Sequence, residues 1–210
     1  MGYISIKIAA ISYQKLFNYE YSFTIVRNRN TPPIDIHLRF SKDTFHHLCG
    51  LHKLKDIEAV RREKREIVFD KIIKGIYPES MFQKSKFYNE ILDRIDCLIR
   101  LEEILDDKNT VFKFNSSADK SSKIEADYLV KNESDGQRYY FMLSQDKKTD
   151  YYFGRSCFAR NKNQRDYSLG HTSYTMLRKI KINLLTDEEP SELFIVPTYK
   201  KQLDTLSTSI

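Results

Sequence analysis

Apolar and polar residues alternate over much of the first forty positions, which is the period of β-strands with one buried face. Residues 1–8 follow this period, and residues 19–27 alternate aromatic with polar side chains. Residues 34–40 carry four apolar side chains on one face. Asparagines and two prolines separate the last two segments at residues 28–33. Such a cluster predicts a turn, so we expect residues 19–40 to form a β-hairpin.

A helical period replaces this alternation from residue 41. Ser41 or Asp43 can cap the first helix. Residues 57–76 predict a charged helix with a thin apolar stripe, and residues 87–105 carry the strongest helical signal of the chain. The apolar stripes of the first and last helices consist of Phe45, Leu48, Leu51 and Leu54, and of Phe87, Ile91, Ile95, Leu98, Leu101 and Leu105.

Short strands return after residue 110, separated by polar turns. Residues 172–182 fit either a helix or a strand, and no internal repeat is apparent. The expected strands cover residues 111–114, 123–131, 138–143, 151–158 and 192–197.

The order of strands, helices and then an antiparallel meander predicts an α+β fold. We expect helices packed on a small antiparallel β-sheet, with an additional N-terminal β-hairpin. One domain over residues 1–200 would hold a β-rich start to residue 40, a helical part over 41–108 and a β-meander over 110–197. Residues 201–210 are expected to be a loose tail.

Composition narrows the class of protein. The 210 residues are 40% hydrophobic and 13% aromatic, which excludes a disordered chain. The formal net charge of +6 suits an anionic partner such as nucleic acid. Three scattered cysteines argue against a disulfide framework or a zinc ribbon, and neither a signal peptide nor a membrane span is apparent. We therefore expect a cytoplasmic protein.

Three of the five histidines, His46, His47 and His52, lie within seven residues. Histidine titrates near neutrality, so His46 or His47 with Lys53 can supply general acid–base catalysis. On a continuous helix His46 would face Gly50 and Lys53, whereas His47 would face Leu51 and Leu54. The alternative without a function is that one histidine packs in the core or caps a helix and that the others are exposed to solvent. The spacing differs from the i, i+4 pair of zinc helices, so we expect neither a metal nor a cofactor.

A second constellation lies at the end of the strand at residues 151–158. Arg155, Arg160, Lys162 and Arg165 are four cations within eleven residues, and aromatic side chains including Tyr152 lie between or before them. Cationic side chains pair with phosphates, and nucleic-acid bases stack on aromatic rings. The candidate substrate-binding residues are therefore Arg160, Lys162, Arg165 and Tyr152. Arg155 and Ser156 are candidates for phosphate contacts. A solvated loop after a core strand is the alternative, and His171 in the next loop is a second-choice acid or base.

The segment from Phe45 to Lys53 resembles the F-x-H-L-x-G-L/I signature of the fourth subgroup of phage-encoded nucleases related to barnase, EndoU, the tRNA-cleaving colicins and RelE. The segment from Tyr152 to Phe158 resembles that family's strand with a serine between hydrophobic residues. The resemblance spans about residues 20–185 and places His47 at the signature histidine. It implies a small antiparallel sheet packed on helices and a metal-independent ribonuclease activity.

These observations predict an endoribonuclease of the toxin or phage-conflict type. His47 would act as acid or base, with His46 or His171 as the other half of the pair. Lys53 and Arg155 would stabilise the phosphate and Ser156 would position it. RNA, possibly a tRNA, and an antitoxin or immunity protein are the expected partners, with no membrane. The alternatives are a non-catalytic nucleic-acid-binding module and a defence or counter-defence protein that binds another protein.

Overall fold

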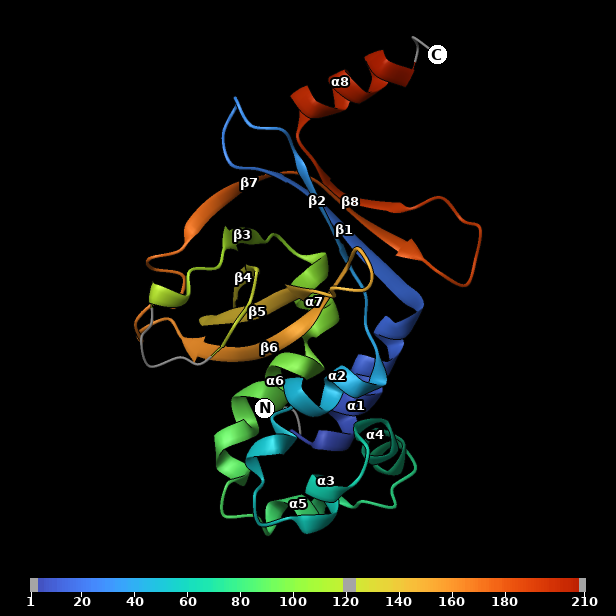
Figure 1. Cartoon of the computed structure of the whole chain (residues 1–210), viewed down its shortest axis with the longest axis vertical. Helices are drawn as coiled ribbons and strands as arrows, with labels where there is room; N and C mark the ends of the chain where they lie inside the picture. Colours follow the sequence, from blue (N-terminus) through green and yellow to red (C-terminus); the bar gives the residue numbers. More distant parts are fainter. Residues whose placement is uncertain (1–3, 119–123, 208–210) are drawn as a thin grey trace.

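The computed structural model describes residues 4–118 and 124–207, with most helices gathered at one end of a strongly curved β-sheet (Figure 1). The α-helices are α1 (Ile6–Lys15), α2 (Lys42–Leu48), α3 (Glu58–Arg62), α4 (Arg65–Ile73), α5 (Glu79–Gln83), α6 (Leu92–Ile99), α7 (Leu101–Asp106) and α8 (Pro197–Ser207). Short 3₁₀ helices are η1 (Leu16–Asn18), η2 (Leu51–Lys53), η3 (Tyr88–Ile91) and η4 (Ser116–Ala118). The strands are β1 (Tyr19–Val26), β2 (Ile34–Leu38), β3 (Thr110–Lys113), β4 (Tyr128–Ser134), β5 (Gln137–Gln145), β6 (Tyr151–Asn161), β7 (Thr172–Asn183) and β8 (Ser191–Ile195).

Seven of these strands close into a barrel. The sheet order is β1-β2-β6-β5-β4-β3-β7-β8, and β1 also pairs with β7. All pairings are antiparallel except that of β2 with β6, which is parallel and joins only His37 to Tyr151 and Leu38 to Tyr152. Strand β8 lies outside the ring and extends β7 on one side.

The predicted architecture is therefore wrong in its sheet. The expected hairpin forms, with Tyr21 opposite Leu38, but it is not an addition to a small sheet. Its first strand pairs with β7, where Phe23 faces Lys179, and its second pairs with β6. Local alternation reveals that a strand exists, but it does not reveal a partner more than 150 residues away.

The main hydrophobic core fills the barrel and continues into the helices. Tyr21, Phe23 and Ile25 alternate inward from β1 and are fully buried. Beyond the barrel end, the ring of Phe45 lies 5.7 Å from that of Tyr13 and 5.0 Å from that of Phe69. Close-packed aromatic rings of this kind fix helices α1, α2 and α4 relative to one another.

A smaller apolar cluster covers the opposite face of strands β4 to β6. On β5, Tyr140 and Met142 face this cluster, whereas the alternate side chains face the barrel core. Phe158 of β6 and Tyr167 of the following loop complete it. Both faces of this part of the sheet are therefore covered, and the second cluster supports one wall of the site described below.

The N-terminal strand prediction is wrong over the described residues. Met1–Tyr3 lie outside the described part of the chain, and α1 begins at Ile6. The side-chain oxygen of Ser5 accepts a hydrogen bond from the amide of Ile8, and the buried residues Ile6, Ala9, Ala10 and Tyr13 follow a helical period. The apolar and polar residues alternate only from residue 4 to residue 8, and this short alternation concealed the longer helical period of the buried residues.

Three further segments differ from the sequence prediction or resolve it. The helix expected over residues 57–76 is interrupted at Glu63 and Lys64, whose backbones are extended, and the helix over 87–105 is divided into η3, α6 and α7. Residues 172–182 are extended, as part of β7. Residues 201–207 of the expected loose tail belong to α8, and residues 208–210 lie outside the described part of the chain.

No helix in the described ranges is long and apolar enough to span a lipid bilayer.

Candidate active site

The histidine-rich segment folds as a helix end followed by a tight reversal. Helix α2 stops at Leu48, and Gly50 adopts a left-handed backbone with φ +79°. The chain then turns into η2, which brings His52 back over His47. Their rings stack with centroids 4.3 Å apart and planes inclined by 13°. This pairing of His47 with His52 could not follow from spacing on a continuous helix, because the helix ends between them.

His46 and His47 have different environments. His46 is buried, and its Nε2 lies 3.2 Å from the carbonyl oxygen of Val60, to which it donates if it carries the hydrogen. His47 is half-buried and lies close enough to Arg155 and Arg94 to feel their charges. The contacts of His46 are those of a packing residue, whereas His47 lies within electrostatic range of two cations that can hold a phosphate.

Both stacked histidines are neutral at pH 7. Burial lowers the pKa of His47 to about 4, and the positive charges of Arg155 and Arg94 act in the same direction. The pKa of His52 is also lowered to about 4, first by burial and then by His47 and Arg94. A neutral imidazole among cations can accept a proton, which is the requirement for a general base.

The sequence prediction missed two residues of this site: His52, to which it gave no catalytic role, and Arg94. Arg94 lies on α6, and its Nη1 donates a hydrogen bond of 3.0 Å to Oγ of Ser156 on β6. In the sequence it is one of many charges on an amphipathic helix, so it resembled a solvated side chain. The only signal in its favour was its position beside the strong apolar stripe of residues 87–105.

Gly50 makes room for Arg94. A Cβ atom at this position would lie 2.7 Å from Cδ of Arg94 and 2.8 Å from Cγ2 of Ile91. Contacts of that length are not tolerated, so a side chain here would displace the arginine. Gly50 is therefore required both for its positive φ and for the close approach of α6.

Ser156 and Arg155 lie where β6 leaves its partner β2. The register of β6 with β5 shifts between Met142 and Leu143, which leaves Arg155 as the extra, exposed residue of a β-bulge and Ser156 buried beside it. Bulges re-aim side chains next to active sites. Helices α2 and α6 pack against this stretch, with Sγ of Cys157 3.8 Å from the carbonyl oxygen of Leu48.

A pocket of about 270 Å³ opens beside these residues. Lys53, Asp93 and Arg94 line its helical wall, and Phe158, Arg160 and Tyr167 line its sheet wall. The guanidinium of Arg160 lies over the rings of Phe158 and Tyr167, at 5.4 and 5.2 Å from their centroids. Partial desolvation raises the pKa of Asp93 above its ordinary value. With three cations and one carboxylate, the pocket favours an anion.

The other predicted residues are dispersed. His171 stacks on Phe114 at 4.8 Å, and its Nδ1 accepts a hydrogen bond of 3.0 Å from the amide of Asn115, so it lies on the loops behind Tyr167 rather than in the stack with His47. Lys162 and Arg165 are exposed in the loop after β6, and Lys162 pairs with Glu133 at 3.9 Å.

Tyr152 faces the barrel core, with its ring 5.7 Å from that of Tyr128. Within residues 4–118 and 124–207, no group of three or more potential ligand side chains is arranged to hold a metal ion.

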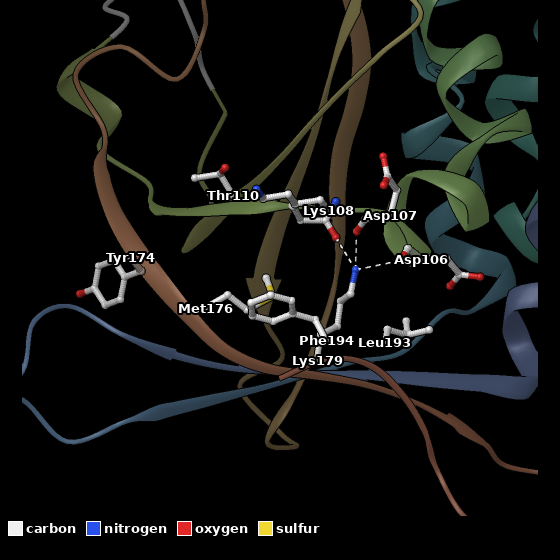
Figure 2. Close-up of a pocket in the computed structure, with 10 residues that line it drawn as sticks. Asp106, Asp107, Lys108, Thr110, Tyr174, Met176, Lys179, Leu193 and Phe194 are labelled. Carbon is white, nitrogen blue, oxygen red and sulfur yellow. Dashed lines mark hydrogen bonds between the residues drawn. The ribbon is translucent and has the colours of Figure 1, made fainter. Parts of the chain in front are cut away.

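A larger pocket of about 410 Å³ lies elsewhere, around the buried Lys179 (Figure 2). The Lys179 ammonium donates to the carbonyl oxygens of Leu105 (2.6 Å), Asp106 (3.2 Å) and Asp107 and to Oδ1 of Asn109 (3.0 Å). Burial lowers the pKa of Lys179 to about 8. Its donors are all used to close the C-terminal end of α7, so we assign this lysine a structural role and place the candidate site at the histidine stack.

Comparison with known proteins adds a family to this geometry. The family model described as "phage-Barnase-EndoU-ColicinE5/D-RelE like nuclease4" matches residues 5–193. Neither the curated proteins nor the solved structures contain a significant match. The family match covers the barrel, the histidine stack and Ser156, and it agrees with the resemblance seen in the two sequence motifs. The chain therefore belongs to this family of phage-type nucleases, whose substrate is a nucleic acid.

Proposed function

We propose that the protein is a metal-independent endoribonuclease that acts in conflicts involving phages or other mobile elements. The observation that carries this proposal is the meeting of two neutral, stacked histidines with Arg94, Arg155 and Ser156 at one edge of the barrel. Cleavage of RNA by its own 2′-hydroxyl needs a base, an acid and cations around the phosphate. The site has candidates for all three.

In the proposed reaction a neutral imidazole of the stack removes the 2′-hydroxyl proton as the 2′-oxygen attacks phosphorus. Arg94 and Arg155 stabilise the charge that develops on the phosphorane oxygens, and Ser156 fixes the direction of the Arg94 guanidinium. The P–O5′ bond then breaks, and the 5′-oxygen takes a proton. The products are a 2′,3′-cyclic phosphate and a 5′-hydroxyl.

The stacked pair can supply both the base and the acid. Two imidazoles 4.3 Å apart cannot both be protonated without repulsion, so the pair holds at most one proton near neutral pH. A bound phosphate offsets the arginine charges that disfavour this proton. One of the two imidazoles, His47 or His52, then donates a proton to the 5′-oxygen, while the other accepts the proton of the 2′-hydroxyl. Lys53, whose Nζ donates to the carbonyl oxygen of Glu90 at 3.3 Å, is another cation at the pocket wall.

The test is cleavage of RNA oligonucleotides in EDTA, with the product ends identified by mass spectrometry. We expect 2′,3′-cyclic phosphate ends and no cleavage where the attacking 2′-hydroxyl is replaced by hydrogen. The variants His47→Asn and His52→Asn should each lose activity by at least about 100-fold. His37→Asn is the matched control, because His37 lies on β2 and pairs with Glu20 at 3.0 Å.

Two outcomes would reject the proposal. Cleavage of the 2′-deoxy substrate would exclude attack by the 2′-hydroxyl. Salt-dependent binding of RNA without any cleavage would instead favour the non-catalytic nucleic-acid-binding module.

A further inference from the structure

The charged run at residues 61–66 contains the break between α3 and α4. The backbones of Glu63 and Lys64 are extended, and α4 begins at Arg65. Lys71, further along α4, forms an ion pair with Glu63 and so ties the break to the helix that follows it. The position of Arg65 is therefore set by the start of a new helix and not by the continuation of α3.

Helices α2 and α4 pack side by side and run in opposite directions. Lys42, at the start of α2, pairs with Asp70 of α4 at 2.8 Å. Further along α2, the ring of Phe45 lies 5.0 Å from that of Phe69, which precedes Asp70 in α4. This antiparallel order places Arg65, the first residue of α4, beside the end of α2 that carries the histidines.

The charge of Arg65 reaches the candidate active site. Burial lowers the pKa of both His46 and His47, and the positive charge of Arg65 acts in the same direction on both. Arg155 and Arg94 act on His47 as well. Helix α2 packs against β6 as well as against α4 (Figure 1). Arginines from three elements, α4, α6 and β6, therefore lie around the end of α2.

Arg65 differs from its neighbours in the charged run because its guanidinium is uncommitted. Arg62 forms an ion pair with Glu58, and Arg61 donates to the carbonyl oxygen of Lys55 at 3.2 Å. Arg65 is exposed, and in the part of the chain that the structure describes no carboxylate lies within ion-pair distance of it. An exposed guanidinium without a carboxylate partner can bind a phosphate through two parallel hydrogen bonds.

We propose that Arg65 binds the RNA backbone at a phosphate next to the one that is cleaved. The proposal rests on the proposed function, which places the cleaved phosphate between Arg94 and Arg155. The strand would then pass over the histidine stack from β6 towards the start of α4. A phosphate outside the reacting group carries the same charge in the ground state and in the transition state, so Arg65 should strengthen binding without raising kcat.

The test is binding of a single-stranded RNA oligonucleotide with fluorine in place of every 2′-hydroxyl, which cannot be cleaved by 2′-hydroxyl attack. Fluorescence anisotropy at several salt concentrations gives its Kd and the slope of log K against log salt. Arg65→Gln should reduce this slope by about 0.7 and raise the Kd about fivefold at about 0.1 M salt, as expected for one lost phosphate contact on a single strand. Arg65→Lys keeps the charge and should recover most of the affinity.

Arg62→Gln is the matched control, because it removes the same charge three residues away. Arg62 lies two positions after the buried Val60 and so on the opposite face of α3. Its salt slope should equal that of the wild type, and thermal unfolding should show that both glutamine variants are folded. An unchanged slope and Kd for Arg65→Gln would overturn the proposal, and so would an equal loss for Arg62→Gln or a wild type without salt-dependent binding.

Cleavage of the corresponding unmodified RNA separates binding from chemistry. Arg65→Gln should raise KM about fivefold and leave kcat unchanged. A fall in kcat as large as that of His47→Asn would place Arg65 at the reacting phosphate and refute its assignment to a neighbouring one. If the wild type binds RNA without cleaving it, the nuclease proposal fails, whereas the binding measurements still decide the role of Arg65.

Discussion

Replacing Gly50 with alanine tests whether this glycine holds the active site together. The left-handed backbone at φ +79° disfavours any side chain by roughly 1–2 kcal/mol. The new Cβ would also lie 2.7 Å from Cδ of Arg94 and 2.8 Å from Cγ2 of Ile91, and overpacking of this kind costs typically about 1–3 kcal/mol. We therefore expect the free energy of unfolding to fall by about 2–5 kcal/mol.

The chain offers a matched control for the backbone part of this cost. Gly136 has φ +74° in the β4–β5 turn, and a Cβ atom there would meet nothing within 4 Å. Gly136→Ala should therefore lower the free energy of unfolding by roughly 1–2 kcal/mol only. Urea unfolding of both variants, with m-values compared, separates the shared backbone strain from the contact with Arg94.

The effect on activity follows from the displacement of Arg94. Moving its Cδ to a normal contact distance shifts the guanidinium from Ser156, and a misplacement of about 1 Å can reduce the rate about 100-fold. Removing the arginine side chain should relieve part of the strain, so Gly50→Ala should be less destabilising in an Arg94→Ala background. Equal losses of stability for Gly50→Ala and Gly136→Ala, together with normal activity, would refute this account.

Three further predictions concern buried and titrating groups. First, His46→Asn should lower the free energy of unfolding by about 1–3 kcal/mol, because it loses packing and the contact with Val60. It should reduce the nuclease activity of the folded protein far less than His47→Asn does, and equal losses of activity in variants shown to be folded would contradict this. Second, the free energy of unfolding should fall as the pH is lowered from about 6.5 to about 4, because His47 and His52 bind fewer protons in the folded than in the unfolded protein over this range. Urea unfolding at several pH values should show a weaker pH dependence for the double variant His47→Asn, His52→Asn, and an unchanged dependence would count against the prediction. Third, Lys179→Met should lower stability by about 3 kcal/mol or more, because it leaves the last carbonyls of α7 without a donor; thermal unfolding measures this, and a neutral result would mean that water replaces the ammonium.

The sequence predicted individual elements better than their arrangement. Alternation located β1 and β2, and the apolar stripe of Phe45, Leu48, Leu51 and Leu54 is fully buried as expected. Barrel closure was missed because the pairing of β1 with β7 is a property of two distant segments. The parallel contact of β2 with β6 spans only two residue pairs and leaves no pattern in the sequence.

The candidate site shows the same division. Local density drew attention to the histidine segment and to Arg155 and Ser156, and the structure places His47 near Arg155. The His47–His52 stack depends on the reversal at Gly50, which a helical interpretation of this residue obscured. Arg94 was hidden because its function depends on where α6 meets β6, and surface charges on helices usually have no such contact.

The closed ring also limits when this enzyme can become active. Strand β1 is made long before its partner β7, which spans Thr172–Asn183. Contacts between such distant segments form slowly and only after the later segment has left the ribosome. We therefore expect the nascent chain to remain without a complete barrel until β7 has emerged. Nuclease activity would then appear only after β7 has been synthesised.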